Sequence, residues 1–176
     1  MEKTKKENLV FDGRVIKLYN DEVYLDNGDT SKREYVSHRG GVCCLAIHNG
    51  LIYFEKQYRY AVRKDIFELP AGKLEIGEEP KEAMIRELKE ELGFISNNME
   101  YIDFMYPSVG YTNEKIYLFF SSDNTQSTQS LDKDECLSIH PLSIKEAYKM
   151  LDNNEIHDAK TVYLMLKLRK RLENNY

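Results

Sequence analysis

Two Asn-Gly pairs in the first third of the chain limit how its N-terminal part can fold. Asn27-Gly28 and Asn49-Gly50 each stand between two runs rich in β-branched and aromatic residues. Asn-Gly favours a tight turn between antiparallel strands, because both residues tolerate a positive φ there. The sequence therefore predicts two β-hairpins and a β-rich first part of the chain.

Start and stop signals predict three helices further along. Pro80 suits the first turn of a helix, where its missing N–H costs nothing, and Gly93 is placed to end that helix. Ser143 and Glu146 form the capping-box pattern that begins a second helix. A third, amphipathic helix is predicted from Asp158, with Val162, Leu166 and Leu168 among its buried residues.

Further extended segments decide the predicted fold class. Strands are expected near residues 100–106, 115–121 and 136–140, and the polar stretch 121–135 is expected to be a surface loop. Strands and helices in this irregular order predict an α+β or sandwich architecture rather than a doubly wound sheet.

Composition and net charge limit the class of protein, its compartment and its partners. The chain has 176 residues, 41% hydrophobic and 31% charged, which is typical of one ordinary globular domain. Its net charge of -5 disfavours a nucleic-acid partner. The apolar run 41–47 is too short to span a membrane, and no secretory signal is visible at the start. We therefore expect a cytoplasmic protein with neither a membrane nor a nucleic-acid partner, and with its three cysteines reduced.

An excess of glutamate marks the segment around the first predicted helix. Between Glu75 and Glu91 seven glutamates stand against three basic residues. Two like charges about 4 Å apart repel by roughly 1 kcal/mol in water, which a solvated helix tolerates. The loop in front of the helix adds glycines and backbone carbonyls, and an all-oxygen ligand set suits Mg²⁺ or Mn²⁺ rather than zinc. By charge alone, a solvated face and a cation site both stay open.

The spacing within this segment is more specific than its charge. Residues 72–94 fit the pattern G-x5-E-x7-R-E-U-x-E-E-x-G-U, in which U is a bulky apolar residue. The matched positions are Gly72, Glu78, Arg86, Glu87, Leu88, Glu90, Glu91 and Gly93. Phe94 takes the final apolar position, where an aliphatic residue is commoner. The chain thus resembles the Nudix hydrolases, which carry this Nudix box. The resemblance implies a mixed β-sheet sandwiched between helices, and metal-dependent hydrolysis of a nucleoside diphosphate linked to another moiety.

The resemblance also implies roles for the box residues. Glu87 and Glu91 would coordinate metal together with the Ala71 carbonyl, and Glu90 would serve a further ion and catalysis. Arg86 would hold the loop against the helix by pairing with loop carboxylates. The structural positions of the box are Gly72, Glu78 and Gly93.

Outside the box the chain resembles the ADP-ribose pyrophosphatase group over nearly its whole length. Matching stretches include "EKQYRYAV", "FELPAGKLEIGEEP" and "YPSVGYTNEKIYLF". The resemblance implies an N-terminal β subdomain over residues 1–38, exchanged between two subunits, and a Nudix domain over residues 39–176. It implies a homodimer whose active site is completed by the partner. It also implies a small nucleotide sugar as substrate, namely ADP-ribose, which a Mg²⁺-dependent enzyme would hydrolyse to AMP and ribose 5-phosphate.

Four residues correspond to substrate-binding positions of that group. Arg33 and Arg59 would bind the pyrophosphate, because a guanidinium offers directed paired donors and stays protonated. Glu34 would contact the adenine or ribose side, and Arg14 stands where some relatives place an aromatic residue that stacks on adenine. Exposed charges at strand ends are the alternative interpretation of these positions.

The segment around Glu114 carries both a candidate base and a departure from the group. Glu114 matches the mobile-loop glutamate proposed as general base in several ADP-ribose hydrolases. The group usually has a proline 15 or 16 residues beyond the box, where this chain has Val109 and Gly110. The missing proline leaves φ free at that point and weakens the assignment of ADP-ribose as substrate.

Two other functions remain open at this level. One keeps the chemistry but changes the substrate to another nucleotide sugar, a dinucleotide or a modified nucleoside triphosphate. The other is a non-catalytic Nudix domain that binds a nucleotide as a sensor, which the intact glutamates of the box disfavour.

Overall fold

The computed structural model describes residues 1–131, 133 and 136–175. The chain divides into two compact units. The first consists of Met1–Gly40 together with Tyr106–Lys115, and the second of Gly41–Met105 and Ile116–Tyr176. The first unit ends two residues after the boundary predicted at residue 38. It also includes a later segment that the sequence did not assign to it.

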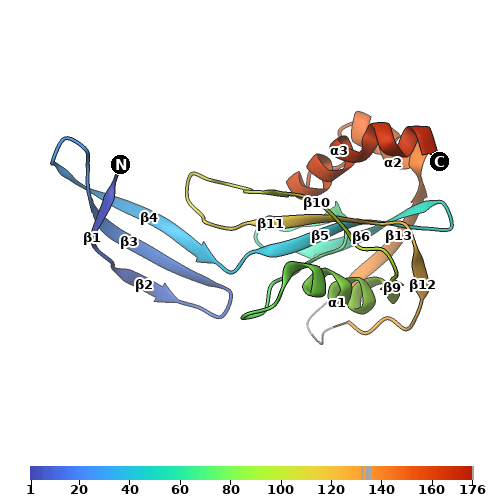
Figure 1. Cartoon of the computed structure of the whole chain (residues 1–176), viewed down its shortest axis with the longest axis horizontal. Helices are drawn as coiled ribbons and strands as arrows, with labels where there is room; N and C mark the ends of the chain where they lie inside the picture. Colours follow the sequence, from blue (N-terminus) through green and yellow to red (C-terminus); the bar gives the residue numbers. More distant parts are fainter. Residues whose placement is uncertain (132, 134–135, 176) are drawn as a thin grey trace. The chain divides into compact units, whose positions relative to one another are not determined.

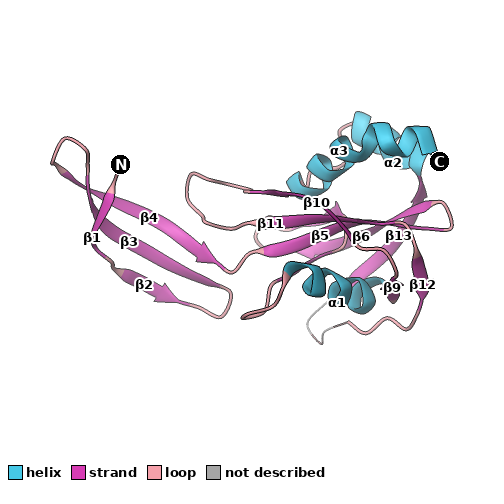
Figure 2. Cartoon of the chain, viewed as in Figure 1, coloured by secondary structure: helices cyan, strands magenta, loops and turns pink. Residues whose placement is uncertain are grey.

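The second unit is built on a seven-stranded mixed sheet (Figure 2). Its main path runs β10-β11-β5-β6-β13, and β7 and β8 pair with β6 and β5 respectively. Among these pairs only β11 with β5 is parallel. The strands are β5 (Gly41–His48), β6 (Leu51–Arg59), β7 (Lys64–Glu68), β8 (Ala71–Lys73), β10 (Glu100–Met105), β11 (Ile116–Ser121) and β13 (Leu137–Ser143).

Helices cover both faces of this sheet (Figure 1). Helix α1 (Pro80–Leu92) packs on one face, and α2 (Ile144–Asp152) and α3 (Ala159–Asn175) pack on the other. The apolar run of β5 is buried on both sides, because alternate residues enter opposite cores: Cys43 faces α2 and α3, and Cys44 faces α1. The predicted α+β fold, a mixed sheet between helices, is confirmed.

The first unit contains a four-stranded antiparallel sheet. Its strands are β1 (Lys3–Lys6), β2 (Leu9–Asp12), β3 (Ile16–Tyr24) and β4 (Thr30–His38). The Asn27-Gly28 hairpin joins β3 to β4, with Gly28 at φ 89°. In the second unit, Asn49 (φ 52°) and Gly50 (φ 74°) join β5 to β6. Both predicted hairpins are therefore present.

The predicted helices are also present, with one error in burial. Helix α1 has Pro80 in its first turn and a left-handed Gly93 at its end, and α2 begins with the predicted capping box of Ser143 and Glu146. Helix α3 buries Leu168, but Leu166 is 53% exposed and its predicted burial was wrong. No helix of the described residues has both the length and the apolarity needed to cross a membrane.

The polar stretch 121–135 is not simply a surface loop. Ser121 and Asn124 are buried, and β12 (Asn124–Gln126) pairs with β9 (Phe94–Ser96), immediately after α1. The buried Asn124 side chain donates to the Ile47 carbonyl at 2.9 Å. Residues 132, 134 and 135 of the predicted loop lie outside the described residues.

Candidate active site

Helix α1 carries two of the glutamates of the site on a face directed inward. Glu87 and Glu91 lie one helical turn apart, and only 7% and 3% of their surfaces are exposed. The apolar residues Leu88 and Leu92 are buried beside them. A solvated helix face is therefore excluded for these two carboxylates, because both are inside the protein.

The segment after β12 closes the C-terminal end of α1. The last carbonyls of a helix have no partner within it and need donors from elsewhere. Here Ser130 N donates to Glu90 O at 3.0 Å, Ser127 N to Gly93 O at 2.6 Å, and the Gln129 side chain to Glu91 O. Polar residues that looked like a loop thus fix the helix end that carries two of the glutamates.

Replacing Gly93 with alanine is expected to lower the free energy of unfolding by about 1–3 kcal/mol. Gly93 has φ 66°, and a Cβ there would lie 2.8 Å from both Gln129 N and Ser127 O. Urea unfolding measures the loss. Gly50→Ala is the matched control, because Gly50 also has a positive φ but no atom within 4 Å of an added Cβ. An equal loss in the two variants would mean that the capping segment does not resist the new side chain.

The start of strand β8 lies directly against the glutamates. Ala71 N donates to Glu91 Oε2 at 3.1 Å, and Pro70 O accepts from Cys44 N at 3.0 Å. Gly72 faces Glu87 so closely that a Cβ on residue 72 would lie 1.8 Å from the Glu87 carboxyl. Strand β8 pairs with β5, and this pairing anchors Ala71 and Gly72 to the central sheet. The backbone at Ala71 and Gly72 and the carboxylates of α1 therefore form one wall of the site.

Arg86 links the box loop to the helix. Its Nε and Nη2 donate to the two oxygens of Glu78 at 2.9 and 3.0 Å, while Nη1 donates to Glu87 Oε1 and Glu90 Oε2, both at 2.9 Å. The paired hydrogen bonds with Glu78 raise the pKa of Arg86 and lower that of Glu78. One guanidinium thus holds three carboxylates and fixes the loop on the helix.

The Glu78 ion pair predicts a specific weakness in acid. Because the folded state lowers the pKa of Glu78 below its ordinary 4.5, the pair stabilises the protein fully above that pH. This stability is lost as the pH falls through the lower folded-state pKa. We expect Glu78→Gln to be less stable than the wild type at pH 7 and to lose less stability on acidification below about pH 5. Thermal unfolding from pH 7 to 3 measures this. The control is Glu79→Gln at the exposed neighbouring position, which is expected to follow the wild-type profile. Parallel curves for Glu78→Gln and wild type would contradict the prediction.

The carboxylates and the main-chain carbonyl at this site are chemically suited to bind a divalent cation. As arranged, no three His, Cys, Asp or Glu side chains within the described part of the chain converge to hold a metal ion. Arg86 lies between Glu87 and Glu90 instead. Carboxylates and a main-chain carbonyl are nevertheless the ligands that Mg²⁺ prefers, and carboxylates as deeply buried as Glu87 and Glu91 favour a nearby cation.

Arg59 ends strand β6 in the same unit. Its Nε donates to Glu68 Oε1 at 2.6 Å, and neither of its Nη nitrogens has a hydrogen-bond partner among the described residues. Burial opposes its charged form, but Glu68 first, and then Asp158 and Glu91, raise its pKa above the ordinary value. Arg59 therefore lies within the electrostatic reach of Glu91 on α1 and has donors available for an anion. The adjacent Tyr58 and Tyr60 are exposed.

The other candidate substrate residues belong to the first unit. Arg14 is exposed in the bend between β2 and β3. Arg33 and Glu34 are neighbours on β4, so their side chains point to opposite faces of the sheet. Arg33 Nε donates to Glu2 at 2.9 Å, and this contact raises the pKa of Arg33. Within this unit the arginine and the glutamate do not converge.

Glu114 stands on the segment 106–115 that the first unit includes. Val36 N donates to Tyr111 O at 2.7 Å, and His38 N to Asn113 Oδ1 at 2.8 Å, so the segment is tied to β4. His38 Nδ1 lies 3.4 Å from Glu114 Oε1. Val109, at the place of the missing proline, is exposed in a turn that the remaining hydrogen bonds hold to the strand.

Two residues of the site escaped the reasoning from sequence. Glu68 and Lys160 are 2% and 9% exposed and form an ion pair across 92 residues of sequence. Both fall in stretches that match the ADP-ribose pyrophosphatase group, "FELPAGK" and "IHDAKT". A charged residue inside such a matched stretch was the available signal, but no local pattern indicates that the two meet.

A glutamate-bearing helix packed against a glycine-containing strand, on a mixed sheet between helices, defines a member of the Nudix class. The model of the NUDIX domain matches residues 37–165. The chain therefore belongs to the NUDIX family.

Three similar proteins match the chain over most of its length. The chain is 38% identical to the ADP-ribose pyrophosphatase of Bacillus subtilis (strain 168), over 98% of this chain and 96% of that protein. It is 42% identical to a methanol dehydrogenase activator of Bacillus methanolicus, over 92% of this chain and 89% of that protein. A crystal structure titled ADP compounds hydrolase has the same fold, with a TM-score of 0.85, 19% identity, and coverage of 98% of this chain and 95% of that one.

Proposed function

We propose that this protein is a Mg²⁺-dependent pyrophosphatase that hydrolyses ADP-ribose to AMP and ribose 5-phosphate. The observation that carries the proposal is the pair of buried carboxylates, Glu87 and Glu91, held against the backbone of Ala71 and Gly72. The relative named ADP-ribose pyrophosphatase, 38% identical over nearly both whole chains, supports this choice of substrate. The cytoplasmic location stays a prediction from the sequence.

The proposed metal ligands are Glu87, Glu90, Glu91 and the Ala71 carbonyl. When bound there, Mg²⁺, or Mn²⁺ in its place, would supply positive charge to the pyrophosphate and would lower the pKa of a water for in-line attack on phosphorus. The chain contributes the geometry. Arg86 sets the positions of Glu87 and Glu90, and the Ala71 N–H orients Glu91.

The proposed substrate contacts are arginines and one glutamate. The free Nη donors of Arg59 suit two oxygens of a pyrophosphate, and its raised pKa keeps the guanidinium charged. Arg33 is proposed to bind the same group, Glu34 the adenosine side, and Arg14 the base by stacking. Glu114 is proposed to accept the proton of the attacking water.

We propose further that residues 1–38 are exchanged in a homodimer whose active sites take residues from both subunits. The sheet of the first unit buries little of its own apolar surface: Val23 is its only hydrophobic residue that is buried among those described. Exposed apolar side chains occur on β2, in the bend after it and at the start of β3, namely Leu9, Val10, Phe11, Val15 and Ile16. An exposed apolar surface of this kind is typical of a protein interface.

Sedimentation at micromolar concentration tests the dimer. The wild type is expected to sediment as a dimer, and Phe11→Lys as a monomer with little activity. Tyr101→Lys is the control, because Tyr101 is equally exposed but lies on β10 of the other unit. A wild-type protein that is monomeric and active would overturn the shared site.

A substrate panel tests the reaction. ADP-ribose, GDP-mannose, a nicotinamide dinucleotide and nucleoside triphosphates are incubated with Mg²⁺, and the products are separated by chromatography. We expect ADP-ribose to give the highest kcat/KM, with AMP and ribose 5-phosphate as products. A preference for a triphosphate or for GDP-mannose would reject the substrate and leave the family assignment unchanged.

The panel also separates the remaining alternatives. The relative named methanol dehydrogenase activator shows that proteins this similar carry other names, so substrates other than ADP-ribose are needed in the panel. A non-catalytic sensor would bind a nucleotide without product formation. The four charged residues Arg86, Glu87, Glu90 and Glu91 are all present and in contact or adjacent, which favours an enzyme.

A further inference from the structure

A buried carboxylate on strand β7 holds two cations from different parts of the fold. Glu68 accepts from Arg59 Nε through Oε1, at 2.6 Å, and from Lys160 Nζ through Oε2. Arg59 ends β6, whereas Lys160 lies in the first turn of α3. Each oxygen of Glu68 thus serves one cation.

Lys160 is in turn held by the start of its own helix. Its Nζ lies 3.0 Å from Asp158 Oδ2, and the same oxygen accepts from Thr161 N at 3.0 Å and Thr161 Oγ1 at 2.7 Å. Thr161 Oγ1 also accepts from Leu69 N at 2.8 Å. The beginning of α3 therefore binds both the Glu68 side chain and the main chain of Leu69, which leads to strand β8.

A cation at the position of Lys160 would be unfavourable without nearby carboxylates. A helix N-terminus disfavours positive charge, and only 9% of this residue is exposed. Burial opposes the charged form, yet Asp158 and Glu68 outweigh it and hold the pKa of Lys160 above its ordinary value. Buried ion pairs contribute little net stability compared with apolar residues of similar size. Stability alone therefore does not account for a lysine here.

We propose that Lys160 is a positioning residue that keeps Arg59 available to the substrate. By occupying Glu68 Oε2, Lys160 leaves only Oε1 for Arg59, so the guanidinium is anchored through Nε alone and both Nη nitrogens stay free. Without Lys160 the second oxygen is open, and Arg59 can form the paired Nε and Nη contact that arginine makes with carboxylates. The guanidinium then turns from the pyrophosphate toward Glu68. This inference rests on the proposed role of Arg59.

Steady-state kinetics on ADP-ribose with Lys160→Met tests the proposal. We expect KM to rise about tenfold, the equivalent of one charge-assisted hydrogen bond, with kcat within about twofold of the wild type. Lys160→Arg is expected to restore KM toward the wild-type value, because it again occupies the second oxygen. In an Arg59→Ala background, Lys160→Met is expected to add nothing to KM. An unchanged KM in Lys160→Met, or full additivity with Arg59→Ala, would overturn the proposal.

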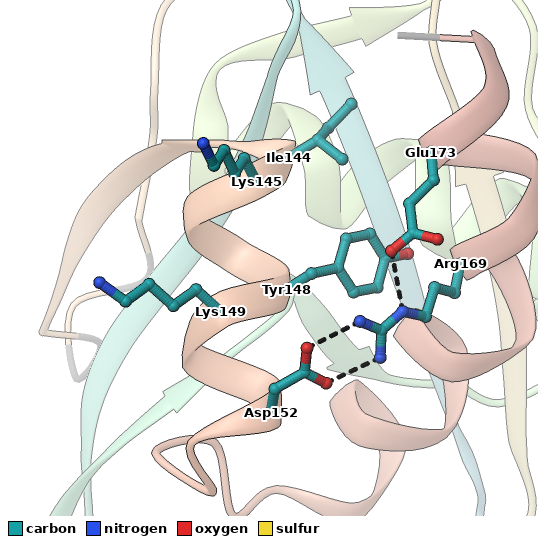
Figure 3. A pocket seen from close by; sticks show the side chains of 7 residues that line it. All are labelled: Ile144, Lys145, Tyr148, Lys149, Asp152, Arg169 and Glu173. Carbon is teal, nitrogen blue, oxygen red and sulfur yellow. Dashed lines mark hydrogen bonds and ion pairs between the residues drawn. The ribbon is translucent and has the colours of Figure 1, made fainter.

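The control residue is Arg169, a second α3 cation held by carboxylates. It donates to both oxygens of Asp152 at 2.7 Å and to Glu173 at 2.9 Å, over the Tyr148 ring and between α2 and α3 (Figure 3). Arg169→Met removes a paired charge from the same helix and is expected to leave KM unchanged. A rise in KM equal to that of Lys160→Met would show a general effect of disturbing α3 and would reject the specific role.

Two further variants separate the possible failures. If Lys160→Met does not fold, as judged by circular dichroism, Glu68→Gln decides the question. It removes the charged anchor of Arg59 and is also expected to raise KM, and an unchanged KM there overturns the proposal. Arg59→Ala alone tests the underlying role. If it leaves KM unchanged, the proposed function of Arg59 fails. If Arg59→Ala raises KM while Lys160→Met does not, only the positioning role fails.

Discussion

Gly72→Ala is expected to reduce kcat about a hundredfold while the fold is retained. An added Cβ would lie 1.8 Å from the Cδ and Oε1 of Glu87, well inside van der Waals contact. The Glu87 carboxylate must therefore move, and a displacement of about 1 Å in a catalytic arrangement costs on the order of 10²-fold in rate. Turnover of ADP-ribose and circular dichroism measure the two parts of the prediction.

The control for Gly72→Ala is Gly77, a glycine in the loop between β8 and α1. Gly77 has φ 78°, and an added Cβ there meets no atom within 4 Å. Gly77→Ala imposes backbone strain of about 1 kcal/mol without displacing the α1 glutamates. It is therefore expected to lower the free energy of unfolding but to leave kcat close to the wild-type value. If Gly72→Ala turns over at the wild-type rate, the Glu87 carboxylate is not needed in its present position.

Glu91→Gln is expected to lower kcat by about 10²–10³-fold and to weaken the apparent affinity for Mg²⁺. Glutamine has the same size, and its side-chain oxygen can still accept from Ala71 N, which now donates to Glu91 Oε2 at 3.1 Å. The substitution therefore removes a charge while this hydrogen bond can be kept. In the absence of metal the variant is expected to remain folded, because this hydrogen bond can be kept.

Titration calorimetry with Mg²⁺ alone and a kinetic assay test this prediction separately. Glu79→Gln is the matched control, because Glu79 is exposed and precedes the helix. Turnover near the wild-type rate in Glu91→Gln would count against a metal role for Glu91. Loss of Mg²⁺ binding together with loss of the fold would instead mean that the residue is structural.

The sequence predicted the local structure around the site well. The turns at Asn27-Gly28 and Asn49-Gly50 and the ends of α1 at Pro80 and Gly93 are all present. Each of these depends on the φ preference or the missing donor of one or two residues, which are properties of the residues themselves. Burial was predicted less well. Leu166 is apolar and exposed, because one position in the pattern does not decide which face of a helix a sheet covers.

The sequence by itself determined the chain's family and the helical spacing of its glutamates. Glycines and carboxylates at fixed intervals in residues 72–94 are a property of the chain before it folds. Only the tertiary structure decided that Glu87 lies against Gly72, that residues 127–130 close the end of α1, and that Glu68 meets Lys160. The physical reason is that a helix end needs donors and a buried carboxylate needs cations wherever they come from. Which segment supplies them follows from the path of the chain over distances that no local pattern encodes.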